Sequence, residues 1–176
     1  MRHKNQSNEF IKTCISMAYI NLLYEKPKED ITVSEICKKS GFGRTTYYRY
    51  FSSDKNELII FIAKAKWEEY KTSHKEEVKQ DEGFQFFTHL YNNKRFMMML
   101  KEQNLIEILF RILFDIYGIQ ETENSILRYG KDIFVGMYFG VIYDWIIQGC
   151  VDTPTDIKNK IEQGFAIAIA EAKRNE

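Results

Sequence analysis

The segment from Arg44 to Tyr50 carries guanidinium, hydroxyl and phenol groups around almost its whole circumference. A helix that only packs against a core needs apolar residues at 3.6-residue spacing with polar residues opposite, and this segment lacks that pattern. Long side chains that donate hydrogen bonds, and tyrosine hydroxyls, instead suit a DNA groove. Base edges form the bottom of such a groove and phosphates lie along its sides. These residue types therefore indicate nucleic-acid binding. The alternative is a solvated helix with surface tyrosines.

The residues before this segment predict a short helix and a tight turn. Thr32 and Glu35 are spaced as a capping box, so a helix should begin after Thr32. Ile31 and Ile36 stand where a hydrophobic staple needs apolar residues. The helix should end at Gly41, because glycine adopts a left-handed C-cap most easily. Two short helices joined by a glycine turn form a helix-turn-helix.

The remainder of the chain is also predicted to be helical. Apolar residues at helical spacing run over residues 7–25, 55–79, 105–117, 122–149 and 154–173. No stretch alternates as strands do, so we expect an all-α fold of about nine helices. An N-terminal three-helix helix-turn-helix domain, residues 1–55, should precede a larger helical regulatory and dimerisation domain, residues 56–176.

Charge is distributed unevenly along a chain whose formal net charge is zero. Residues 1–55 hold ten basic against six acidic residues, a net charge of +4, and residues 56–176 carry −4. A basic front suits a protein that offers one end to a polyanion. No segment approaches the roughly 18 apolar residues of a membrane span. The polar start lacks the apolar core of a signal peptide, so a cytoplasmic protein without membrane contact is expected.

The residue pattern gives no support for catalysis. The three histidines are scattered, no nucleophile has a recognisable setting, and no glycine-rich phosphate loop is found. Cys14, Cys37 and Cys150 share no metal-ligand spacing. We therefore expect no enzyme, no metal and no cofactor. The cysteines are expected to be small buried hydrophobes, with a thiol switch between Cys14 and Cys37 as the alternative.

The stretch from Thr32 to Phe51, followed by Lys55 and Leu58, resembles the DNA-binding signature of the TetR (tetracycline-repressor-like) family. That signature has a threonine, an apolar pair, a small-residue turn, a short recognition helix and a Tyr-x-x-Phe ending. The resemblance implies a sequence-specific transcriptional regulator, acting as a repressor on double-stranded DNA at a palindromic operator. It also implies that Tyr47 and Phe51 face inward.

The resemblance further assigns roles to individual residues. Those implied to contact DNA are Arg44, Thr45 and Thr46 at base edges, Ser34 at bases or phosphate, Tyr48 and Tyr50 at phosphates, and Thr32 and Lys55 at helix N-termini. Arg44 is the best candidate for sequence choice, because a guanidinium grips guanine O6 and N7 together. The residues between Phe51 and Lys55 are one more than the family pattern has.

A short recognition helix reads few base pairs, so two copies about 34 Å apart are the usual remedy. We expect a homodimer whose interface is formed by small and apolar residues at four-residue spacing: Gly136, Gly140, Ile157, Ile161, Gly164 and Ala168. The alternative is that these stripes pack within one subunit.

Aromatic residues and methionines concentrate in the second domain. The residues expected to line an apolar effector pocket are Phe87, Met98, Phe110, Phe114, Phe134, Tyr138 and Trp145. A small molecule bound there would control operator affinity through the helix over residues 55–79. Ordinary core packing is the alternative for each residue. A protein partner in place of the small molecule would make the chain a co-regulator.

Overall fold

A computed structural model describes residues 2–117 and 124–174, with side chains for all of these except residues 2–6, 168, 169, 172 and 173. The described residues form ten α-helices and one turn of 3-10 helix, η1, and contain no strand. The predicted all-α fold is therefore confirmed, with a helix number close to the one expected. None of the helices in these two ranges is both long enough and apolar enough to cross a membrane.

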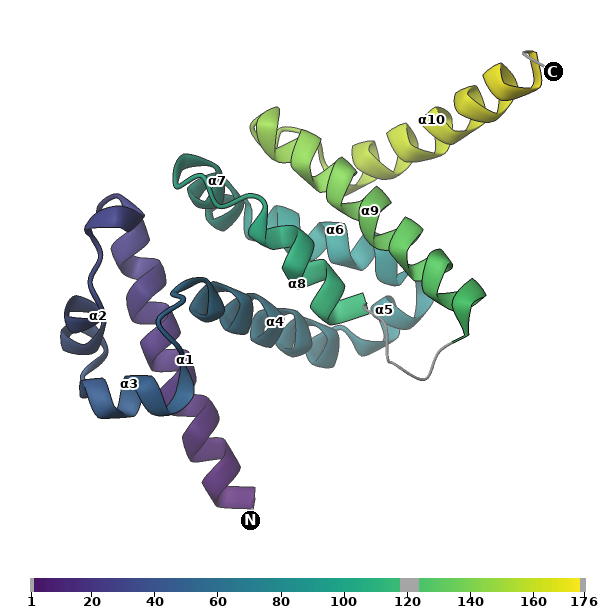
Figure 1. Cartoon of the computed structure of the whole chain (residues 1–176). Helices are drawn as coiled ribbons and strands as arrows, with labels where there is room; N and C mark the ends of the chain where they lie inside the picture. The colour runs from purple at the N-terminus through teal and green to yellow at the C-terminus, as the bar shows by residue number, and fades with distance from the viewer. Residues whose placement is uncertain (1, 118–123, 175–176) are drawn as a thin grey trace.

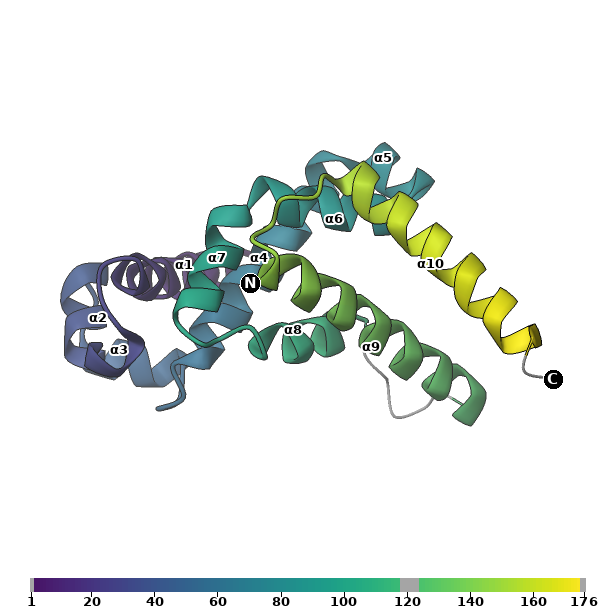
Figure 2. The same ribbon diagram turned by 90° about the horizontal axis from the view of Figure 1, so that it is seen from above.

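The first helices of the chain lie at one end of the molecule (Figures 1 and 2). They are α1 (Arg2–Leu23), η1 (Lys28–Asp30), α2 (Val33–Ser40) and α3 (Arg44–Tyr50). α1 packs against α2 and also against α4, while α3 packs against α2. The buried residues of α1 include Ile15, Ala18, Tyr19 and Leu22, which recur every three or four positions and so face the same side. α1 thus supports α2 directly, and α3 packs in turn on α2.

α4 (Asn56–Ser73) connects this end to the rest of the molecule. It contacts α1 on one side and α5, α6 and α8 on the other. Leu58, Ile59, Ile62 and Trp67 are buried along it, so it is apolar on more than one face. A helix with this pattern belongs inside a bundle, because each face must be covered by a neighbour.

The single helix predicted over residues 55–79 is instead two helices. α4 ends at Ser73 and α5 (Lys75–Gln80) begins after His74, whose ψ of 41° departs from helical geometry. The Ser73 hydroxyl donates to the Glu69 and Tyr70 carbonyls, at 3.0 and 3.1 Å. Such side-chain bonds compete with the helical ladder and offer the backbone another conformation. The sequence pattern missed this break, because neither residue is glycine or proline.

The second half of the chain forms the body of the molecule. Its helices are α6 (Glu82–Asn92), α7 (Lys94–Glu102), α8 (Ile108–Tyr117), α9 (Ser125–Ile147) and α10 (Pro154–Arg174). α9 packs on α7 and α8, while α10 touches α6 near its start and then extends away from the body (Figure 2). The Lys158 ammonium pairs with Asp81 at 2.7 Å, which fixes the first turns of α10 beside α6.

One glutamine links the body to the end of α1. The Gln103 side chain follows α7, and its amide group donates to the Leu23 and Lys26 carbonyls at 2.7 and 3.1 Å. Its oxygen accepts the Lys28 amide at 2.8 Å. Backbone groups at a helix end need partners from outside the helix. Gln103 therefore satisfies three backbone groups of the α1–η1 loop from a position about 75 residues later in the chain.

Candidate nucleic-acid interface

The start and end of α2 follow the predicted local signals. Thr32 accepts the Glu35 amide at 3.3 Å and Glu35 accepts the Thr32 amide at 2.9 Å, which closes the capping box. Ile31 and Ile36 are both buried. Gly41 has a φ of 78° and donates its amide to the Cys37 carbonyl. Glycine lets the chain turn sharply here, because a residue with a side chain would be strained at this φ.

α3 has a buried side and an exposed side. Tyr47 and Phe51 are buried, with exposed fractions of 0% and 5%, so the expectation that both face inward is confirmed. Their rings lie 6.0 Å apart, and the Phe51 ring packs edge-on to that of Phe61 on α4. Tyr48 is 50% exposed. Two aromatic rings therefore fix a helix of only seven residues, whose own helix propensity is mediocre.

Five of the residues expected to contact DNA have side-chain polar groups without a partner among the described residues. They are Ser34, Arg44, Thr45, Thr46 and Tyr48. Within the described part of the chain, none of these five side chains forms a hydrogen bond or ion pair. Thr46 is half-buried, and the other four are exposed. Apart from Ser34, which lies in the first turn of α2, all of them lie on α3. This leaves their polar groups available to a ligand.

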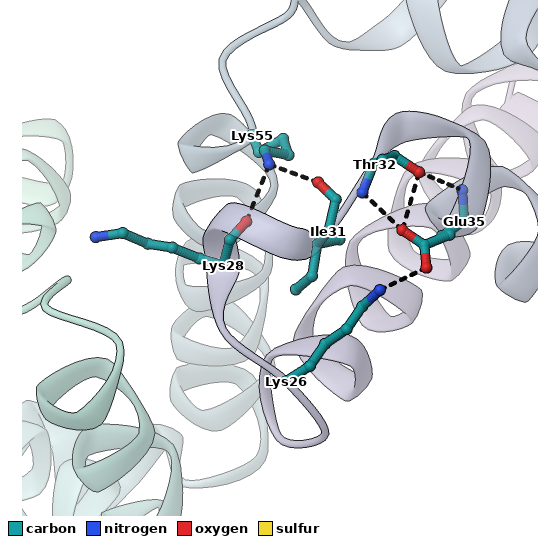
Figure 3. Close-up of polar contacts among 6 residues, drawn as sticks. All are labelled: Lys26, Lys28, Ile31, Thr32, Glu35 and Lys55. Atoms are coloured by element: carbon teal, nitrogen blue, oxygen red, sulfur yellow. Dashed lines mark hydrogen bonds and ion pairs between the residues drawn. The ribbon is translucent and has the colours of Figure 1, made fainter.

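The other three expected contacts are engaged within the protein. The Lys55 ammonium donates to the Ile31 and Lys28 carbonyls at 2.6 and 3.2 Å, which ties the start of α4 to η1 (Figure 3). Tyr50 donates its hydroxyl to Asn8 on α1 at 2.6 Å. The Thr32 hydroxyl belongs to the capping box. The structure therefore gives these three side chains positioning roles within the fold.

Charge on the two short helices is positive where it is not neutralised. Lys38, Arg44 and Arg49 are exposed, and none forms an ion pair with another described residue. The acidic residue of α2, Glu35, is paired with the Lys26 ammonium (Figure 3). Hydrogen bonds from Lys26 and then from Thr32 lower the pKa of Glu35 to about 2. The only carboxylate of these two helices is thus balanced by a cation, so it offers little repulsion to an approaching anion.

The expected effector pocket is not where the cavity lies. A partly open cavity of about 190 Å³ is lined by α1, α4, α6, α7, α8 and one residue of α9, and none of the seven expected pocket residues lines it. On α8 the lining residues are Leu109, Ile112, Leu113 and Ile116. Phe110 and Phe114 lie on the opposite face of α8 and are 46% and 39% exposed. The physical reason is helical phase: α8 is apolar on both faces, so the sequence did not show which side faces inward.

The remaining five expected pocket residues have other surroundings. Phe87, Phe134 and Tyr138 pack together, with ring centroids 5.4 Å apart for Phe87 and Tyr138 and 4.3 Å for Phe134 and Tyr138. Trp145 is buried and donates its indole N–H to the Asp152 carbonyl at 3.0 Å. Met98 is half-buried on α7. These residues fill space between helices, as ordinary core packing requires.

Four of the six expected dimer residues line a groove between α9 and α10, and Gly136 lies outside it. Gly140, Ile157, Ile161 and Gly164 all line it, together with Trp145. Ile157 is only 4% exposed, so it belongs to the core of the subunit. A Cβ atom added at Gly136, Gly140 or Gly164 would meet no described atom within 4 Å. These glycines therefore do not serve close packing among the described residues of one subunit. The side chain of Ala168 lies outside the described residues.

Large apolar side chains are exposed on the same two helices. Ile133 on α9 is 72% exposed, and Phe165 and Ile167 on α10 are 52% and 59% exposed. No other described part of the chain covers these side chains or the open glycines. Large apolar patches on a protein surface usually mark an interaction site.

A comparison with models of protein families finds no match, and a search of curated proteins finds none either.

Proposed function

We propose that the chain is a sequence-specific DNA-binding transcriptional regulator of the TetR type, with α3 as the recognition helix. The observation that carries this proposal is the division of α3 into two sides. Tyr47 and Phe51 anchor one side in the core, while Arg44, Thr45 and Tyr48 are exposed and make no polar side-chain contact within the described structure. A helix held in this way presents donors to base edges without having to give up internal bonds.

The contact set of the proposal is narrower than the one inferred from the sequence. Arg44, Thr45 and Thr46 are assigned to base edges, and Ser34 and Tyr48 to phosphates or flanking bases. Thr32, Tyr50 and Lys55 hold the helix-turn-helix in shape, because their polar groups are used internally. We propose that the protein represses transcription by occupying its operator.

A homodimer completes the proposal. One α3 presents seven residues, which is too short to specify a long site. The exposed apolar residues and open glycines of α9 and α10 support pairing of two copies through these helices. We further propose that a small molecule bound in the helical body controls operator affinity. The exposed face of α9 and α10 also suits a protein partner, which would make the chain a co-regulator.

Selection of random DNA duplexes on the purified protein tests the central proposal. We expect the recovered sequences to share a palindromic site, because a two-fold dimer reads two identical half-sites. Affinity for that site should fall steeply as salt rises from 50 to 200 mM, since phosphate binding releases counterions. Failure to retain any duplex at low ionic strength would contradict DNA binding.

The α9–α10 interface can be tested by sedimentation of the wild type beside two arginine variants. Gly164→Arg places a long charged side chain in the groove, whereas Asn159→Arg places it at an exposed position of α10 outside the groove. We expect wild type and Asn159→Arg to sediment at twice the chain mass, and Gly164→Arg at the mass of one chain, with operator binding lost. A wild type that sediments as a monomer at micromolar concentration would exclude the dimer.

A further inference from the structure

The turn between α7 and α8 is bonded to the loop that follows α1. The three hydrogen bonds of the Gln103 side chain to Leu23, Lys26 and Lys28 are 2.7–3.1 Å long and partly buried, so water competes with them less than at the surface. The Asn104 carbonyl accepts the Lys28 ammonium at 3.1 Å. Asn104 has a φ of 51°, a left-handed conformation that asparagine tolerates better than most residues. This turn thus binds the α1–η1 loop through both of its residues.

Lys28 is bonded both to this turn and to residues that support α2. Its amide and its ammonium bond to the turn, while its carbonyl accepts the Lys55 ammonium at 3.2 Å (Figure 3). The same ammonium donates to the Ile31 carbonyl at 2.6 Å, and Ile31 precedes Thr32, the N-cap of α2. A displacement of Lys28 would therefore be passed to the start of α2, and α3 follows α2 after one turn.

The other attachments between the recognition end, defined as residues 1–55, and the body are less firm at this place. Where α1 faces α7, the apolar packing is interrupted by the cavity of about 190 Å³, whose lining includes Met17 and Met97. A cavity wall lacks the contacts that a filled interface has.

Two further contacts between the recognition end and the body are exposed. The Arg111 guanidinium lies 3.7 Å from the Asp54 carboxylate, and both side chains are about half exposed. The Arg95 guanidinium lies over the Tyr24 ring at 4.7 Å. Exposed contacts of these kinds stabilise weakly. The Gln103 hydrogen bonds are therefore the firmest polar attachment at this place among the described residues.

We propose that Gln103 is a positioning residue that fixes the recognition end relative to the body, and so sets the half-site spacing that a dimer accepts. This inference rests on the proposed function. The proposed dimer surface on α9 and α10 belongs to the body, whereas α3 belongs to the recognition end. The distance between two α3 helices in a dimer thus depends on how these two parts are held in each chain. Base preference depends instead on the side chains of α3.

Gln103→Leu tests this role by competition between operators of different spacing, because leucine cannot form hydrogen bonds with its side chain. One base pair added at the centre of the selected palindrome separates the half-sites by a further 3.4 Å or so and rotates them by about 35°. We expect the wild type to prefer the selected spacing at least about tenfold, and Gln103→Leu less than about threefold, since three hydrogen bonds are lost. The order of base preference within a half-site should stay that of the wild type.

Two variants accompany this measurement. Gln80→Leu is the matched control, because Gln80 is exposed at the end of α5 and its side chain bonds no described residue. It should keep the wild-type spacing preference. Gln103→Glu keeps an acceptor for the Lys28 amide but cannot donate to the Leu23 and Lys26 carbonyls. It should lower the spacing preference as Gln103→Leu does, and it decides the matter if Gln103→Leu does not melt cooperatively.

A measurement without DNA separates this proposal from the proposed function. Nitroxide labels are attached through a ketone-bearing amino acid at Lys38 of α2 and at Glu107 just before α8, both of which are exposed. The labelled chain is diluted with unlabelled protein, so that electron–electron resonance reports distances within one chain. We expect one narrow distance distribution in the wild type and in Gln80→Leu, and a broader or displaced one in both Gln103 variants.

An identical distance distribution in the wild type and in both Gln103 variants would overturn the proposal. An unchanged spacing preference in these variants, or a changed order of base preference, would overturn it as well. A broadened distribution in a chain that retains no DNA would support the positioning role of Gln103 and contradict only the proposed function.

Discussion

Replacement of Arg44 by alanine is expected to remove most of the choice among DNA sequences and to weaken operator binding by about 1–3 kcal/mol. Arg44 is the first residue of α3, is exposed, and forms no ion pair with any other described residue. Its guanidinium is therefore free to bind guanine O6 and N7 together. The measurement is a competition between duplexes that differ from the selected site at single base pairs.

Two further variants separate sequence choice from general attraction. Arg49→Ala removes the same charge at the other end of α3, and it should weaken binding to all duplexes while leaving their order of preference intact. Tyr48→Phe should likewise weaken most sequences to a similar degree, because phosphates carry no base identity. An Arg44→Ala protein that keeps the wild-type order of preference would show that another residue reads the bases.

Acidification from pH 7 to pH 5 is expected to lower the free energy of unfolding by about 2 kcal/mol through His89 alone. Burial lowers the pKa of His89 from its ordinary value of 6.5 to about 4. At a pH between these two values, the His89 ring is mostly protonated in the unfolded chain and mostly neutral in the folded chain. Stability is thus complete above pH 6.5 and declines as the pH falls toward 4. Urea unfolding at both pH values measures the change.

His89→Phe provides the comparison, because it keeps an aromatic ring beside Trp67 and Tyr70 and removes the titrating group. Its stability should depend less on pH in this interval than that of the wild type, by the same 2 kcal/mol or so. Glu35 does not interfere, since its pKa is lowered from 4.5 to about 2 and its linked stability is lost only below that interval. Equal pH dependence in both proteins would show that His89 is not the cause.

The local parts of the fold could be predicted because their signals lie within a few residues. The Thr32–Glu35 spacing and Gly41 set the two ends of α2, and both behave as predicted. The break at His74 could not be predicted, since it depends on how hydroxyl groups bond to the preceding turn. Helix existence was thus easier to predict than helix continuity.

The site could be predicted only in part, for a different reason. The outward and inward sides of α3 follow from residue types, and the burial of Tyr47 agrees with the expectation. The hydrogen bonds from the Lys55 ammonium reach carbonyls 24 and 27 positions earlier in the chain, so no local sequence pattern predicts them. Likewise, the cavity falls beside Trp67 and His89, which only tertiary packing brings together. The only local feature in the sequence that pointed to this cavity was His89, which stands within a run of aromatic residues.

The Gln103 bridge limits how far the first helices of this chain can be transferred to another protein. A chimera that joined residues 1–55 of this chain to a foreign body would lose the amide that caps Leu23, Lys26 and Lys28. Three main-chain groups would then lose their hydrogen-bond partner, and the transferred helices would be held less firmly against the foreign domain. Exchanging only the exposed α3 residues Arg44, Thr45, Tyr48 and Arg49 would keep the Tyr47 anchor and the three Gln103 hydrogen bonds in place.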